Sequence, residues 1–509
     1  MEELQSGMVS LQVGQGRADA IVARYIEHYH GNSQAAKALC RELRRGAEGQ
    51  EVPDLLDVLA HYDRSAGPAL PSATISQHIS NAALPTPLLP GPLRYHITHT
   101  HSTLHPSNIL LLRSILLPTR RFDTSLPDPD FVTSLTPCLL TSGADKRILF
   151  SLPDSGEVIE AFEPAARPGL VDGGHTAPVL DVAQHPREKR ELITVGMDGS
   201  VILWDLLLRK PVLQRSKDHA RFVVRCVWSE DGEWLATAGY DKKINIYQRE
   251  VGQSDRMDDD TKEDGIEVQP LNTSLTLRQS IVTQGNPEAI VFLPNDAQPP
   301  DVPGPTSPWL VWTQREDCHV NYLQVGVADA QATSLRFNTN PSPTDTHVSY
   351  SLLSLALHPT LRLLSIVTGS HATEGAVSQI LLLPLFSGER VQTIHTTVPS
   401  SSSFVPRQAW FTTPENASRG EGVWVASEHG RLKLYDLATG EEKADIGVHG
   451  AASESVDGGG GAGMSAEEKA KRWRMGTMNG VIKDVITLSD GRVATCGFDR
   501  TVRILERAN

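Results

Sequence analysis

The sequence predicts a mainly β protein, a seven-bladed β-propeller preceded by a small N-terminal α-helical module. Three observations predict this fold. A short apolar strand that ends in a turn recurs seven times after residue 92. A second pattern follows several of these strands, in which a Thr precedes an Asp by four residues and a large residue follows the Asp by six. Residues 19–45 instead carry apolar side chains at helical spacing.

The strand-and-turn pattern sets the number of blades. Its copies are residues 109–118, 179–186, 224–231, 289–294, 353–359, 408–414 and 482–488. Each copy begins one blade, so we expect the propeller to occupy residues 93–509. Within it, three long connections are predicted as insertions, at about 251–270, 294–308 and 450–475.

The Thr/Asp pattern is clearest in residues 192–205, 235–247 and 493–505. It also fits Thr141 with Asp145 and Thr313 with Asp317, and loosely the segment 427–435, where His429 replaces the Asp. A set of Asp, His and Thr invites comparison with a catalytic triad, but its repetition along the chain indicates a structural role. A carboxylate accepts hydrogen bonds from the N–H groups of a tight turn, and its neighbours satisfy one another.

These repeats resemble the WD40 repeat family, because Gly174-His175 and Trp204-Asp205 bracket one near-complete copy. In that family a His, a Ser or Thr, an Asp and a Trp form a buried hydrogen-bonded chain in each blade. The resemblance implies this structural role for His175, Thr194, Asp198 and Trp204, for His219, Thr237, Asp241 and Tyr247, and for Thr495 and Asp499. Blade five, about 350–397, shows neither the Asp nor the aromatic residue.

The last repeat lacks an outer strand, because the chain ends shortly after its third strand. Residues 93–99 alternate apolar and polar side chains, as a half-buried strand does. We expect this segment to complete the last blade and so to close the ring. His101 is expected to take the His position of the first blade, rather than to join His96 and His99 in a metal site.

The N-terminal region, residues 1–46, resembles the LisH motif, in which two short helices pair with a second copy. The resemblance implies a homodimer, with Ile21, Tyr25, Ile26, Ala36 and Leu39 as the candidate dimerisation residues. The segment 29–32 departs from the motif, so a helical cap packed on the propeller is the alternative. Residues 47–92 are predicted as a helix followed by a linker rich in Pro and Ser.

Composition narrows the classes of function. The formal net charge of −14 disfavours general nucleic-acid binding. The five cysteines contain no CxxC pair, which argues against a disulfide framework and a zinc site. The sequence lacks a signal peptide pattern and a membrane-spanning apolar run, so we expect no membrane partner and an intracellular protein, cytoplasmic or nuclear.

No motif typical of a nucleophile, a phosphate loop or a dinucleotide site is present, so we predict no enzyme activity, no cofactor and no metal. The expected function is a protein–protein interaction scaffold that binds partner peptides on one propeller face. The candidate partner-binding residues are Met197, Arg221, Phe222, Tyr240, Glu316 and Phe498. The alternatives are a subunit of a ubiquitin-ligase, transcriptional or cytoskeletal complex, and an enzyme on a propeller scaffold.

Overall fold

The computed structural model describes residues 85–508, apart from 124–129, 167–173, 253–268, 300–306, 328–331, 343, 346, 349, 371–375, 401–403, 412–419 and 451–478. The predicted LisH-like module, with Ile21, Tyr25, Ile26, Ala36 and Leu39, lies outside these residues, as do the parts 253–268, 300–306 and 451–475 of the predicted insertions. The described residues form strands and no helix, so no helix in this part of the chain could span a membrane.

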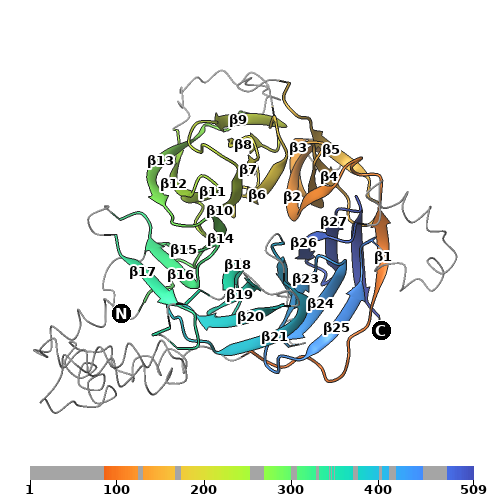
Figure 1. The fold of residues 1–509 in the computed structure, drawn as a ribbon. Helices are drawn as coiled ribbons and strands as arrows, with labels where there is room; N and C mark the ends of the chain where they lie inside the picture. The colour runs from red at the N-terminus through yellow and green to blue at the C-terminus, as the bar shows by residue number, and fades with distance from the viewer. Residues whose placement is uncertain are drawn as a thin grey trace, which may run out of the picture. The chain divides into compact units, whose positions relative to one another are not determined.

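The strands form seven four-stranded antiparallel sheets, the blades of a propeller (Figure 1). Blade 1 contains β2 (Ile109–Asp123), β3 (Asp130–Gly143), β4 (Ile148–Ser151) and β5 (Val158–Phe162). Blade 2 contains β6 (Val179–Gln184), β7 (Glu191–Gly196), β8 (Val201–Asp205) and β9 (Lys210–Arg215). Blade 3 contains β10 (Val223–Trp228), β11 (Trp234–Gly239), β12 (Lys243–Val251) and β13 (Thr273–Val282).

The remaining blades follow in chain order. Blade 4 contains β14 (Pro287–Phe292), β15 (Trp309–Gln314), β16 (His319–Gln324) and β17 (Ser334–Asn338). Blade 5 contains β18 (Tyr350–Leu357), β19 (Leu363–Ser370), β20 (Val377–Pro384) and β21 (Gln392–Pro399). Blade 6 contains β22 (Gln408–Trp410), β23 (Gly422–Ala426), β24 (Arg431–Asp436) and β25 (Glu442–Gly447). Blade 7 contains β26 (Ile482–Thr487), β27 (Val493–Gly497), β28 (Val502–Arg507) and β1 (Tyr95–His101).

The first strands of neighbouring blades contact one another around the whole ring, including β2 with β26. The predicted closure of the ring is confirmed, because β1 pairs with β28 as the outer strand of blade 7. The strand begins at Tyr95, which lies opposite Arg507, and ends at His101, which lies opposite Val502. Pairing the two parts of the chain removes an edge that would otherwise be open to another strand.

The end of the predicted linker is packed against the propeller. Leu88 is buried in the cluster of blades 6 and 7 with Phe411 and Trp424, and its backbone N–H donates to Asp436 over 2.8 Å. Leu93 donates its N–H to the carbonyl of Lys443 at 2.7 Å. The propeller unit therefore includes residues before the predicted boundary at residue 93, and it begins at Ala82.

The core lies between blades, because each sheet buries apolar side chains on both faces. Between blades 1 and 2, Phe150 and Phe162 pack with Leu192 and Trp204. The rings of Phe162 and Trp204 stack with their centroids 4.3 Å apart. Trp204, the residue predicted at the Trp position, thus contributes an aromatic stacking contact to the interface between blades 1 and 2.

A histidine–tryptophan contact joins some first strands on one face of the ring. His185, at the end of β6, contacts the carbonyl of Gly232 at 3.0 Å and packs edge-on against Trp228 of blade 3. The Trp228 indole donates back to the blade 2 backbone at 3.2 Å. His358 and Trp410 repeat this contact between blades 5 and 6. We call this side, where the first and second strands connect, the His-Pro face.

Blade 1 departs from the sequence prediction on the same face. Its first strand was expected to end at Pro118, but β2 continues to Asp123 and stays paired with β3 as far as Asp130. The extended hairpin exposes Phe122, whose accessible fraction is 48%. The second and third strands connect on the opposite side of the ring, which we call the Asp-turn face.

Candidate functional site

The turns of the Asp-turn face are held by buried hydrogen-bonded chains. In blade 2, His175 Nδ1 lies 3.0 Å from the Asp198 carboxylate and His175 Nε2 lies 2.8 Å from Thr194 Oγ1. Trp204 Nε1 donates to the same hydroxyl at 2.8 Å. The four side chains that the sequence predicted as one set are therefore in contact, and they tie the loop before β6 to the turn between β7 and β8.

Blade 3 has the same arrangement with one change. His219 lies 3.0 Å from Asp241 and 2.8 Å from the Thr237 hydroxyl. Tyr247 occupies the aromatic position, but its hydroxyl donates to Asp218 at 3.1 Å. Burial raises the pKa of Tyr247, and the neighbouring Asp218 charge adds to that rise. The phenol therefore remains a hydrogen-bond donor at neutral pH.

In blade 7 the histidine of the chain is one that sequence reasoning missed. His449 lies 2.8 Å from Asp499 and 2.9 Å from the Thr495 hydroxyl, and all three side chains are buried. The Gly450 N–H also donates to Asp499, at 3.1 Å. His449 is separated from Thr495 by 46 residues, which concealed the pairing in the sequence.

In blade 1 the prediction for His101 is wrong. Its place is taken by His105, which lies 2.9 Å from Asp145 and 3.0 Å from the Thr141 hydroxyl. His101 instead ends strand β1, and its Nε2 lies 2.7 Å from the carbonyl of Pro153. The short connection between β1 and β2 delivers His105, rather than His101, to the turn between β3 and β4.

Three carboxylates of these chains have a pKa below the usual value for Asp. Burial by itself would raise the pKa of Asp198 and Asp499, but the hydrogen bonds and charge of the partner histidine, with backbone N–H donors, lower it below the usual value. The same balance lowers the pKa of Asp145. Each carboxylate is thus stabilised as an acceptor within its turn, which is a structural role.

In blade 4 the His–Asp–Thr hydrogen-bonded chain is incomplete. The Thr313 hydroxyl is buried without a hydrogen-bond partner, while Asp317 accepts from Gln314 at 2.6 Å. Asp317, Cys318 and His319 offer ligand atoms close enough for a metal ion. The Arg336 guanidinium donates to both oxygens of Asp317, at 3.1 and 3.2 Å, so a cation already occupies this position.

Blades 5 and 6 also hold their turns differently. In blade 6, His429 stands where the pattern expects the Asp, and its side chain is 65% exposed. The Tyr435 hydroxyl bonds to Glu442 at 3.2 Å and accepts the Thr397 N–H at 3.0 Å. Among the described residues, the complete His–Asp–Thr chain is therefore found in blades 7, 1, 2 and 3.

The candidate partner-binding residues all belong to the Asp-turn face, but the structure divides them into two groups. Tyr240 is tied across to blade 4, with its hydroxyl 3.3 Å from Glu288. Phe498 is half-buried under the Lys483 ammonium, 5.9 Å from the ring centroid, and Met197 is half-buried in its turn. These side chains contribute to the shape of the face.

The second group is exposed. Phe222 is 45% accessible, and Arg221 beside it is exposed in the loop between β9 and β10. Glu316 is exposed in the turn between β15 and β16, where its φ of 59° holds it in the left-handed region. Arg221, Phe222 and Glu316 are therefore the members of the predicted set that are exposed to a partner.

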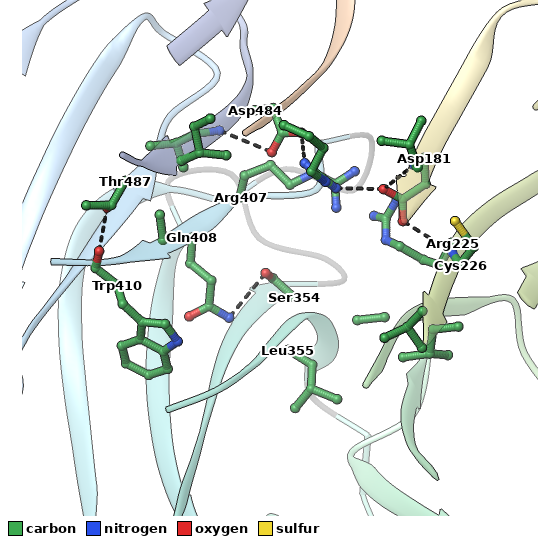
Figure 2. A pocket seen from close by; sticks show the side chains of 18 of the residues that line it. Asp181, Arg225, Cys226, Ser354, Leu355, Arg407, Gln408, Trp410, Asp484 and Thr487 are labelled. Carbon is green, nitrogen blue, oxygen red and sulfur yellow. Dashed lines mark hydrogen bonds and ion pairs between the residues drawn. The ribbon is translucent and has the colours of Figure 1, made fainter. Parts of the chain in front are cut away.

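A cavity of about 670 Å³ occupies the central channel, lined by the first strands of the blades (Figure 2). Its size lies in the range of ordinary ligand sites. Ionisable side chains from separate blades line it, namely Arg113, Asp181, Arg225, Arg407 and Asp484, and all of these except Arg113 are labelled in Figure 2. Sequence reasoning did not select them. The signal available was a charged residue inside an otherwise apolar first strand, as in residues 109–113 and 223–226.

Arg113 connects three blades across this cavity. Its guanidinium bonds to Asp484 of blade 7 and, at 2.7 Å, to Asp181 of blade 2. Asp181 also accepts the Cys226 N–H of blade 3 at 3.2 Å. Burial by itself would lower the pKa of Arg113, but the two carboxylates raise it, so this arginine is a permanent bridge beside the seam of the ring.

Comparison with known proteins identifies the repeats. A family model described as "WD domain, G-beta repeat" matches residues 168–205 and 211–248, which cover blades 2 and 3. The WD40 repeats of RRP9 have a similar fold, with a TM-score of 0.50 and 12% identity over 82% of this chain and 99% of that one. The structure of U3-55K gives the same values. The chain therefore carries WD40 repeats and folds as a seven-bladed propeller.

Curated relatives match over short segments. "Cell division cycle 20.1, cofactor of APC complex" of Arabidopsis thaliana is 34% identical over 82 residues, which are 16% of this chain and 17% of that protein. Coronin-7 of Homo sapiens is 32% identical over 110 residues, 21% of this chain and 11% of that protein. The chain thus matches less than a fifth of the length of either relative.

Proposed function

We propose that this protein is a non-catalytic interaction scaffold that binds partner peptides on the Asp-turn face of its propeller. The observation that carries the proposal is the exposed pair Arg221 and Phe222 on a face whose turns are fixed by buried hydrogen bonds. Arginine and aromatic side chains are common anchors of protein interfaces. A rigid frame lowers the entropy lost when such anchors are immobilised by a partner.

The chemistry of the repeated polar sets supports a structural rather than a catalytic role. The His and Thr of each His–Asp–Thr chain are buried, and the members of the chain bond to one another and to backbone groups of their own blade. A general base must reach a substrate proton. Side chains that are buried in this way do not present a reactive atom to the solvent, which favours a binding protein over an enzyme.

The experiment compares two surface phenylalanines. Partners of the full chain are collected from cells by affinity purification and identified by mass spectrometry, and each is then tested for direct binding. Phe222→Ala combined with Arg221→Ala is expected to weaken binding at least tenfold, because hot-spot truncations cost about 2 kcal/mol or more. Phe122→Ala is the matched control, since Phe122 is 48% exposed on the His-Pro face.

Equal loss of binding in both variants, or none in either, contradicts the use of the Asp-turn face.

We further propose that the protein dimerises through residues 19–45, where the spacing of Tyr25 and Leu39 resembles the LisH motif. A second candidate function is membership of a large complex. A segment of this chain is similar to a protein named as a cofactor of the APC complex, and this similarity favours the second candidate. In such a complex the scaffold would hold one partner near others.

A further inference from the structure

The central channel contains more cations than its carboxylates can neutralise. Arg225 and Arg407 project into the cavity from blades 3 and 6 (Figure 2). Arg113 also lines this cavity. Lys483 precedes Asp484 on β26 and is affected by the charges of Arg407 and Arg225, but it does not line the cavity. The three arginines therefore exceed the two lining carboxylates of Asp181 and Asp484 by one positive charge, and Lys483 adds a second beside the cavity.

The carboxylates are already engaged by other groups. Arg113 binds both, and each also accepts a backbone N–H, from Cys226 to Asp181 and from Leu112 to Asp484. Glu288, the carboxylate at the start of the blade 4 first strand, is held by Arg315 at 2.6 Å. Both lining carboxylates, Asp181 and Asp484, are therefore already engaged by groups other than Arg225 and Arg407.

Those cations lack ionic partners in the described part of the chain. Arg225 donates to the carbonyl of Val224, at 2.5 Å, and makes no ion pair there. The Arg407 carbonyl accepts the Ala426 N–H at 2.9 Å, but the Arg407 guanidinium has no hydrogen-bonded or ionic partner within the same residues. Lys483 has its contact with the Phe498 ring and no carboxylate within ion-pair distance.

Their protonation reflects this crowding. Burial, together with the neighbouring Arg225 and Arg113 charges, lowers the pKa of Arg407 to about 10, and Asp484 opposes this shift only in part. Burial, together with the Arg407 and Arg225 charges, lowers the pKa of Lys483 to about 8. The cations repel one another, and a bound anion would relieve that repulsion.

We propose that the channel binds a phosphorylated side chain of a partner peptide, with Arg225 and Arg407 holding its phosphate and Lys483 adding positive charge beside them. A phosphate monoester carries close to two negative charges at neutral pH and offers three acceptor oxygens, which matches the charge excess of the site. A peptide source follows from the proposed function, on which this inference rests. The apolar remainder of the cavity wall, including Leu355 and Trp410, can accept flanking side chains.

The test measures fluorescence anisotropy of a labelled degenerate peptide library with a central phosphoserine, titrated with the full chain. The same library with unmodified serine is the comparison. We expect the phosphorylated library to bind at least about tenfold more tightly, with inorganic phosphate competing and with binding weakening as salt is raised. Equal affinity for both libraries would overturn the proposal.

Arg225→Gln and Arg407→Gln are each expected to lower phosphopeptide affinity about tenfold or more while the melting temperature of the ligand-free protein stays unchanged or rises. A merely structural arginine would instead lower the melting temperature. Lys210→Gln removes one positive charge from the exposed outer strand β9, and it should leave affinity unchanged. Loss of affinity in all three variants would show that total charge, rather than this site, controls binding.

Two further outcomes separate this inference from the proposed function. If a directly binding partner keeps its affinity for the Arg407→Gln variant, the scaffold stands and the phosphate site is wrong. If inorganic phosphate raises the melting temperature but the phosphopeptide library fails to bind, the channel takes a small anion and the peptide part of the proposal is wrong.

Discussion

Replacing Arg113 with methionine tests whether the ring is held together beside its seam by ion pairs. The substitution keeps an unbranched side chain but removes the guanidinium that bridges Asp181 and Asp484. Breaking a buried ion pair typically costs 3–5 kcal/mol, because the remaining charge is left buried. Arg113 is 28% exposed, and both carboxylates keep backbone N–H donors. We therefore expect about 3 kcal/mol for the loss of both pairs together.

This free energy corresponds to a measurable change in melting temperature. Unfolding entropy is about 2.1 cal/mol/K per residue, so a unit of this size has about 0.9 kcal/mol/K in total. A loss of about 3 kcal/mol then lowers the melting temperature by about 3 °C. Differential scanning calorimetry of the full chain measures this shift directly, and circular dichroism provides the check that the variant is folded.

Two further variants make the result decisive. Combining Arg113→Met with Asp181→Asn and Asp484→Asn should not recover the lost stability, because it leaves the Arg225 and Arg407 cations without the carboxylates that favour their charged form. Arg407→Gln should show the opposite sign from Arg113→Met, because Arg407 faces other cations. The reasoning is refuted if Arg113→Met melts within the error of the wild type, or if Arg113→Met and Arg407→Gln shift it alike.

Three other predictions follow from the same contacts. His449→Ala should lower the free energy of unfolding in urea by about 2–4 kcal/mol, because two buried partners lose a hydrogen bond. His429→Ala, in an exposed turn, should change this free energy little, and similar effects of the two variants would contradict the hydrogen-bonded chain of His449, Thr495 and Asp499. Burial lowers the pKa of His219, so the folded state resists protonation; its stability should be complete above a pH of about 6.5 and fall as the pH is lowered through that value. The fall should be shallower in His219→Gln, and an unchanged pH profile would exclude this histidine as its source. Tyr25→Asp with Leu39→Asp should convert a dimer to a monomer in size exclusion with light scattering, and a mass that does not change would refute the dimer.

The sequence was sufficient for features that depend on short spacing. The Thr of each chain lies on the second strand of its blade and the Asp lies in the tight turn that follows, so their separation is fixed and visible in every blade that retains them. The histidine arrives from the preceding loop. It lies 19 and 18 residues before Thr194 and Thr237, but 36 before Thr141 and 46 before Thr495. The long β2–β3 hairpin and the segment 451–478 account for the two histidines that were missed or misplaced.

The channel could not be predicted from spacing, because its members meet only when the ring closes. Arg113 and Asp484 are 371 residues apart, and they are neighbours because β2 lies next to β26. A charged side chain in an apolar strand was the local sign, but it fits an exposed strand end equally well. The direction in which Arg225 and Arg407 point depends on which face of the inner strand meets the channel. That face is set by the bulge near the start of most first strands, which shifts the register by one residue.

Two groups of neighbouring blades are stabilised by different contacts, and the charged side chains of the central channel differ between the same two groups. Blades 7, 1, 2 and 3 keep the His–Asp–Thr chain, and Arg113 joins three of them. Blades 4 to 6 rely more on fully buried aromatic side chains, including Trp309, Tyr322 and Trp424. Arg407 enters the channel from blade 6, in this second group, and no described carboxylate forms an ion pair with it. An anion bound between Arg225 and Arg407 would connect blades 3 and 6 as Asp181 and Asp484 connect their blades through Arg113. Ligand binding and ring stability should therefore be coupled, because the same inner strands carry both.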